Sequence, residues 1–149
     1  MVTLTSLSNT EILGLTIIGE ARGEKIEGQV GVGNVIRNRL QSNPIKYKSY
    51  HDVCLEPKQF SCWNKNDPNY EYLLGLAGRI INNQERQFNK YLQQCMFVAQ
   101  GIHEDLLLDN TGKCKFYMTI NLFRTNRPGW AENAIKVREI GNHIFFDLR

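Results

Sequence analysis

Residues 19–24 read Gly-Glu-Ala-Arg-Gly-Glu and contain the first candidate for acid–base chemistry. Glu20 follows the largely apolar run 15–18, and burial in such surroundings disfavours a charged carboxylate. A glutamate that stays protonated near neutral pH can donate a proton to a reacting oxygen. The glycines on both sides would let a polymer approach the backbone. The segment therefore predicts a general acid at Glu20, and the structural alternative is an exposed glutamate paired with Arg22 or Lys25.

A second candidate segment, residues 58–63, combines neutral polar groups with flat apolar ones. Gln59 and Ser61 offer hydrogen-bonding groups, and Phe60 and Trp63 offer ring surfaces. Sugars bind well to this mixture, because their ring faces are apolar and their rims carry hydroxyl groups. The segment predicts a carbohydrate site, and the alternative is that the two aromatic residues anchor the loop in the core.

A third candidate is His143, which lies in the strand-like segment 140–146. In a strand its side chain points to the face opposite to that of its neighbours. We expect it to contact substrate, and the alternative is a buried structural histidine. His51 and His103 are isolated in the sequence and are expected at the surface. No metal site and no cofactor is predicted.

The four cysteines carry no recognisable site. No C-x-x-C motif occurs, and no histidine falls at zinc-ligand spacing from them. We expect free thiols, with a disulfide only if the mature protein works outside the cell.

Composition limits the class of protein to which the chain can belong. Its 149 residues are 42% apolar and 22% charged, which excludes a disordered chain and predicts a single domain over residues 1–149. The formal net charge of +3 weakly favours an anionic polymer as partner. Lysine and arginine are scattered, which argues against a nucleic-acid interface. The longest apolar run, residues 95–99, is far shorter than the ~20 residues that stable membrane insertion needs.

The elements that must position these candidates are mainly helical. Ser8 and Glu11 fit a capping box at the start of a first helix, which should end within residues 19–22. Apolar periodicity predicts three further helices over residues 25–40, 70–82 and 85–102. The second of these contains Gly28, Gly31 and Gly33, which indicate either close packing of another backbone or a broken helix.

The remaining segments are a long loop and two short strands. Residues 44–68 hold three prolines and predict a loop with at most one short helical turn. Residues 115–120 and 140–148 have strand-like composition. The fold class that follows is mainly α (α+β), with a small C-terminal strand pair.

Taken together and in this order, four segments resemble a known family. They are residues 19–24, the small-residue helix that ends in Asn38-Arg39, the Gln59-Phe60-Ser61 segment, and residues 140–145. The pattern is similar to the cell wall hydrolase family that includes the catalytic domains of spore cortex-lytic enzymes. The resemblance spans about residues 10–147. It departs from the family at residues 109–115, where lysines and a cysteine replace the small residues of the turn that precedes an aromatic pair.

The resemblance implies a compact, lysozyme-like helical domain related to lytic transglycosylases. The implied activity is cleavage of peptidoglycan between N-acetylmuramic acid and N-acetylglucosamine, with Glu20 as the catalytic glutamate. In a transglycosylase the C6 hydroxyl of the substrate attacks, and Glu20 then acts as base. A muramidase-type hydrolase needs a second carboxylate, ~5–9.5 Å away. Candidates for it are Glu24, Glu27, Asp52 and Glu56, and the sequence does not choose among them.

The predicted site therefore has one catalytic residue, Glu20, and six substrate-binding residues: Glu24, Gln59, Phe60, Ser61, Tyr117 and His143. The expected partner is the peptidoglycan glycan strand, and the expected state is a monomer. Because no signal peptide is visible, we expect a protein made in the cytoplasm that reaches the wall by a route such as phage delivery. A non-catalytic wall-binding or virion protein that keeps this fold is the alternative.

Overall fold

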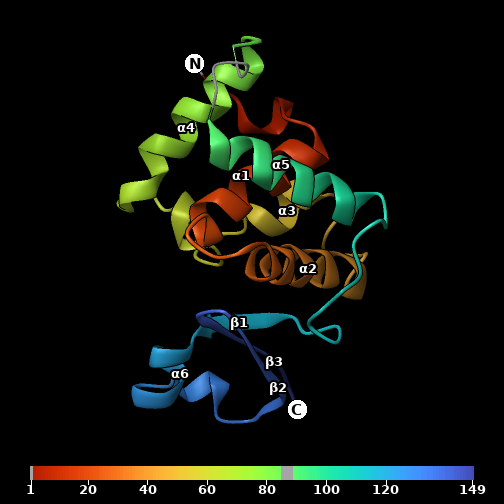
Figure 1. Ribbon diagram of the computed structural model, residues 1–149, viewed down its shortest axis with the longest axis vertical. Helices are drawn as coiled ribbons and strands as arrows, with labels where there is room; N and C mark the ends of the chain where they lie inside the picture. Colours follow the sequence, from red (N-terminus) through yellow and green to blue (C-terminus); the bar gives the residue numbers. More distant parts are fainter. Residues whose placement is uncertain (1, 85–88) are drawn as a thin grey trace.

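Helices and a small sheet lie on the two sides of helix α2 (Ile26–Ser42), as Figure 1 shows for the computed structural model. The structure describes residues 2–84 and 89–149. The other α-helices are α1 (Asn9–Ala21), α3 (Tyr50–Cys54), α4 (Pro68–Ile81), α5 (Lys90–His103) and α6 (Ile120–Thr125). The strands are β1 (Phe116–Thr119), β2 (Ala134–Ile140) and β3 (His143–Leu148), and short 3₁₀ turns are η1 (Leu4–Ser6), η2 (Ser61–Trp63) and η3 (Gly129–Ala131). We call α1–α5 the helical lobe and residues 116–149 the small lobe.

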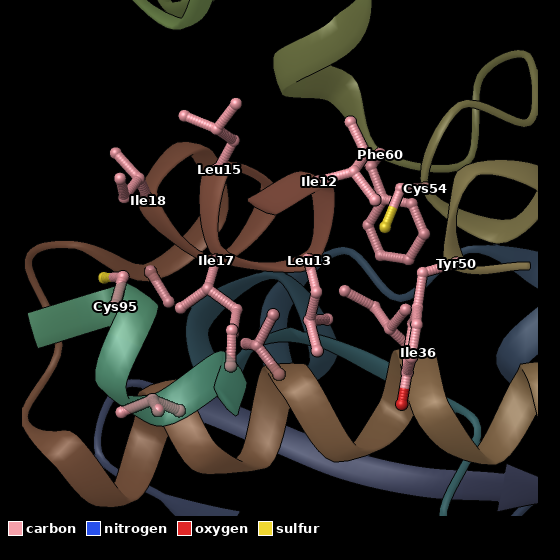
Figure 2. Packing of buried hydrophobic residues seen from close by; sticks show 14 of the residues in the cluster. Ile12, Leu13, Leu15, Ile17, Ile18, Ile36, Tyr50, Cys54, Phe60 and Cys95 are labelled. Atoms are coloured by element: carbon pink, nitrogen blue, oxygen red, sulfur yellow. The ribbon is translucent and has the colours of Figure 1, made fainter. Parts of the chain in front are cut away.

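Helix α1 is the central element of the helical lobe. It begins at Ser8 with the predicted capping box: the Ser8 hydroxyl accepts from the Glu11 backbone N–H at 3.1 Å, and the Glu11 carboxylate accepts from the Ser8 N–H at 2.8 Å. Nearly all of its later residues are buried, because other helices surround it. Figure 2 shows apolar side chains of α1 packed between this helix and its neighbours α2 and α5.

Helix α2 runs unbroken through its three glycines, so the alternative of a broken helix is wrong. A Cβ atom at Gly31 would overlap the ring of Phe145 on β3. A Cβ atom at Gly33 would overlap the side chain of Ile102 on α5. The predicted close approach therefore exists, but side chains make it rather than a second backbone. Because residues two apart point to opposite sides of a helix, these glycines let α2 pack closely on the small lobe on one side and on α5 on the other.

The sheet has one strand more than the predicted pair, in the antiparallel order β1-β3-β2. The segment expected as one strand, 140–148, contains a hairpin turn at Gly141, which has a positive φ of 60°. Strand β2 was not predicted, because its register shifts between Ile135 and Arg138 and most of its residues are exposed, so apolar and polar residues do not alternate. The mainly helical fold with a small C-terminal sheet is confirmed.

Other element boundaries differ locally from the prediction. The expected loop 44–68 contains α3 and η2, and α4 starts earlier than expected because the Asp67 side chain caps it, accepting from the Asn69 N–H at 2.8 Å. Helix α6 was not predicted. The side chain of Thr119, the last residue of β1, caps this helix by accepting a hydrogen bond from the Leu122 N–H. The predicted start of the fourth helix at residues 85–88 lies outside the described residues.

Two further sequence expectations concern the cysteines and the membrane. All four cysteines are buried and free, as expected. Within residues 2–84 and 89–149, no helix is long and apolar enough to cross a membrane.

Candidate active site

A cavity of about 690 Å³ lies between the two lobes. The helical lobe contributes the end of α1, Arg39 of α2 and the loop residues Lys58, Gln59 and Ser61. The small lobe contributes strand β1, Leu122, Trp130 and His143. A cavity of this size and mixed polarity is suited to hold a small ligand or one section of a polymer.

Glu20 lies in this cavity, on the last turn of α1, and both of its carboxyl oxygens have donors. The Tyr117 hydroxyl on β1 donates to Oε1 at 2.5 Å, and the Cys62 backbone N–H of η2 donates to Oε2 at 3.2 Å. Burial, together with the nearby Glu20, raises the pKa of Tyr117, so its hydroxyl keeps its proton and remains a donor. The carboxyl group is therefore fixed in a half-buried position with its reactive atoms at the cavity.

Of the loop residues predicted to bind sugar, Gln59 and Ser61 are exposed and line the cavity with Glu20. Phe60 between them points inward. Its side chain is 1% exposed and packs in the main core, where Figure 2 shows it beside Ile12 and Cys54. The prediction that Phe60 contacts substrate is therefore wrong. The local chain alternates direction here, so burying the ring exposes the two polar neighbours.

Trp63, named with Phe60 as a possible sugar-binding surface, also belongs to the core. It packs against the buried cluster, and its Nε1–H donates to the Thr16 hydroxyl at 3.0 Å. Both aromatic residues thus anchor the loop, which was the alternative for this segment.

His143 lines the cavity but is largely buried. Its ring and that of Tyr117 form a T-shaped contact, with 5.2 Å between the ring centroids. Burial lowers the pKa of His143, and the nearby Glu24 and Glu20 only partly oppose this shift, so the imidazole is neutral at pH 7. Its Nδ1 is buried and has no hydrogen-bond partner among the described residues.

Glu24 lies behind His143 rather than in the cavity lining. Its Oε1 is 3.6 Å from His143 Nδ1. The carboxylate accepts hydrogen bonds from the backbone N–H and the side-chain amide of Asn142, both at 2.9 Å. Burial acts to raise the pKa of Glu24, but the two Asn142 hydrogen bonds and His143 outweigh it and lower the pKa. This position supports a role in holding the hairpin and His143, and it does not support the predicted substrate contact.

The other candidates for a second carboxylate also lie elsewhere. Asp52 accepts from the Lys48 backbone N–H, and Glu56 accepts from the Tyr47 hydroxyl and Lys46 in a different hollow. The side chain of Glu27 is exposed on α2. Among residues 2–84 and 89–149, Glu20 is the one carboxylate that lines the cavity.

Arg39 lines the cavity and was not predicted as a site residue. Its Nε–H donates to the Lys115 carbonyl at 2.7 Å, and Nη1 donates to Gln59 Oε1 at 3.2 Å. The guanidinium also lies over the rings of Phe60 and Phe116, at 5.1 and 5.3 Å from their centroids. Arg39 therefore joins the helical lobe to the loop and to β1. The Asn38-Arg39 pair in the sequence resemblance is the signal that could have pointed to it.

Five more cavity residues were also missed: Phe116, Met118, Thr119, Leu122 and Trp130. All five belong to the small lobe. Residues 109–115, where the sequence departs from the family pattern, do not line the cavity; Asp109 there closes a turn by accepting from Thr111 and Lys113. The departure therefore lies outside the lining of the Glu20 cavity.

A comparison with known protein families shows the family of this chain. Residues 23–146 match the family model described as Cell Wall Hydrolase. The chain belongs to the cell wall hydrolase family. The matched range begins at Gly23, after Glu20. The role expected for Glu20 is therefore supported by the geometry of the site and not by the family match.

Two curated relatives of this chain are spore cortex-lytic enzymes. A spore cortex-lytic enzyme of Oceanobacillus iheyensis is 27% identical over 140 residues, which cover 94% of this chain and 42% of that protein. A spore cortex-lytic enzyme of Bacillus subtilis is 43% identical over 56 residues, 38% of this chain and 18% of that protein. The chain thus spans less than half the length of these relatives.

A solved structure shows the same fold. The catalytic domain of the germination-specific lytic transglycosylase SleB from Bacillus anthracis superimposes with a TM-score of 0.58 at 23% identity, covering 97% of this chain and all of that one. This chain therefore shares the fold of that catalytic domain.

Proposed function

We propose that this cell wall hydrolase domain cleaves the glycan strands of peptidoglycan between N-acetylmuramic acid and N-acetylglucosamine, as a lytic transglycosylase. The observation that carries the proposal is Glu20, the one carboxylate lining the cavity within the described residues, with both oxygens held by donors. The names of its relatives, spore cortex-lytic enzyme and lytic transglycosylase, support the same chemistry.

In the first step, protonated Glu20 donates its proton to the glycosidic oxygen while the bond from that oxygen to C1 of the muramic residue breaks. The Tyr117 hydroxyl and the Cys62 N–H then stabilise the carboxylate that forms, because both are already aimed at its oxygens. In the second step, the C6 hydroxyl of the same muramic residue attacks C1. Its proton returns to Glu20, and a 1,6-anhydro ring closes.

A two-carboxylate hydrolase fits this cavity less well. It needs a second carboxylate ~5–9.5 Å from the acid, to act as nucleophile or to activate water. Glu24, the nearest candidate in sequence, is held outside the lining by Asn142. An intramolecular hydroxyl as nucleophile removes the need for that group.

The test is the Glu20→Gln variant, assayed on purified peptidoglycan with mass spectrometry of the released fragments. The amide keeps the size of the side chain but has no proton to transfer, so turnover should fall by at least ~10²–10⁴-fold. Glu27→Gln is the matched control, because Glu27 is an exposed carboxylate outside the cavity lining. The parent enzyme should release muramic ends that are lighter by one water than those from hydrolysis.

Three results would contradict the proposal. Near-normal turnover by folded Glu20→Gln would remove Glu20 from the mechanism. Reducing muramic ends, together with an inactive Glu24→Gln variant, would establish the hydrolase instead. Binding of peptidoglycan by the parent protein with no fragments released would establish a non-catalytic wall-binding protein.

A further inference from the structure

Two large apolar side chains of the small lobe are exposed within the cavity that holds Glu20. Trp130 is 56% exposed and Leu122 is 38% exposed, and both line this cavity. Exposed aromatic surface of this size inside a concave site marks a place where a ligand binds. The proposed proton transfer requires neither residue, so it does not explain why these two apolar side chains are exposed in the cavity.

The indole of Trp130 is held in place from behind. Its ring packs on Phe146, with 6.1 Å between centroids and 30° between planes, and on Phe116, with 5.8 Å and 46°. Phe146 is completely buried, so it is a fixed support. Leu122 is held by α6, which the Thr119 side chain caps at its start. The surface is therefore ordered before any ligand arrives, which lowers the entropy cost of binding.

The occupant is indicated by what shares the cavity with this surface. Gln59 and Ser61 of the helical lobe supply neutral hydrogen-bonding groups, and Glu20 supplies the catalytic carboxyl. A flat apolar wall from one lobe and polar side chains from the other match a pyranose ring, which has an apolar face and a rim of hydroxyl and amide groups. Because the surface is continuous with the catalytic site, a ring bound there belongs to the strand being cleaved.

We infer that Trp130 and Leu122 form a platform that binds the apolar face of a sugar ring adjacent to the bond that Glu20 cleaves. This inference rests on the proposed function, since it assigns the substrate contacts of the same cavity. Because the platform contacts sugar before and during reaction alike, it lowers KM and leaves kcat nearly unchanged.

The chain suits a fluorescence test because it contains two tryptophans, Trp63 and Trp130. Replacing Trp63 with Phe leaves Trp130 as the sole reporter, and adding Glu20→Gln prevents turnover. Peptide-free glycan strands prepared from peptidoglycan are then titrated into this double variant. We expect a saturable blue shift and intensity change of the Trp130 emission. Unchanged emission, while a sedimentation assay shows that the strands bind, would overturn the inference.

Substitutions in the otherwise unchanged protein give the second readout. Trp130→Ala should raise KM for glycan strands about tenfold to a hundredfold, the loss expected for one well-buried apolar contact, with kcat within about threefold. Trp130→Phe retains a flat ring and should recover most of the lost affinity, which a purely structural role in the small lobe would not require. A fall in kcat with KM unchanged would overturn the platform.

Two outcomes separate this inference from its premise. If Glu20→Gln proves active but the fluorescence titration saturates, the proposed catalytic role fails while the platform stands. If Trp130 emission changes on dilution without any glycan, a second copy of the chain covers the surface, and the platform is wrong.

Discussion

Replacing Phe60 with alanine tests whether this side chain stabilises the core or contacts the substrate, because its neighbours Gln59 and Ser61 both line the cavity. The ring is 1% exposed and lies in the main core, in contact with the Arg39 guanidinium. Truncating a fully buried phenylalanine costs about 3–5 kcal/mol, from the lost transfer free energy and the cavity that remains. A domain of this size has a total unfolding free energy of about 5–15 kcal/mol, so the loss is a large share of it. The melting temperature should fall by about 6–20 °C.

The assay is denaturant unfolding followed by circular dichroism, with glycan binding measured at a temperature where the variant is folded. Phe60→Leu keeps most of the buried apolar volume and should lose about 1–2 kcal/mol, which provides a folded variant if alanine is too severe. Gln59→Ala is the neighbouring control: this exposed residue should change the unfolding free energy by less than about 0.5 kcal/mol yet weaken glycan binding. A Phe60→Ala protein of unchanged stability that no longer binds glycan would show that the ring contacts sugar and does not pack in the core.

The remaining predictions concern Glu24 and the cysteines. Because the folded state lowers the pKa of Glu24, its contribution to stability is present above its unfolded pKa and is lost as pH falls through the folded value. The Glu24→Gln variant should therefore be about 1–2 kcal/mol less stable than the parent at pH 7, and this difference should shrink below about pH 4.5. Urea unfolding at several pH values measures the difference. A difference that does not change with pH would contradict this role of Glu24. Burial raises the pKa of the four thiols, to about 12 for Cys54 and Cys95, so thiol reagents at pH 8 should label none of them in the native protein and all of them in denaturant. Rapid native labelling of any one would show that its site opens.

The sequence was sufficient for the four long helices because their signals are local, whereas the short helices α3 and α6 were not predicted. The Ser8 capping box and the apolar periodicity of α1, α2, α4 and α5 involve neighbours within one or two turns. Strand β2 was missed because a register shift and an exposed face remove the alternation that identifies strands. Phe60 was misassigned because composition does not say which way a loop side chain points. The structure shows the direction, because the Phe60 side chain is almost fully buried in the core.

The site itself depends on contacts that no local pattern contains. The two donors to Glu20 lie 42 and 97 residues away in sequence, one in the helical lobe and one in the small lobe. Glu20 is therefore fixed only when both lobes are in place. Arg39 reinforces this dependence, since it donates to the loop that precedes η2 and to the carbonyl just before β1. The small lobe is thus part of the proposed active site, because it supplies the Tyr117 hydroxyl that holds the Glu20 carboxyl group. It also supplies Trp130, the proposed support for the sugar, so a loosened small lobe would impair proton transfer and substrate binding together.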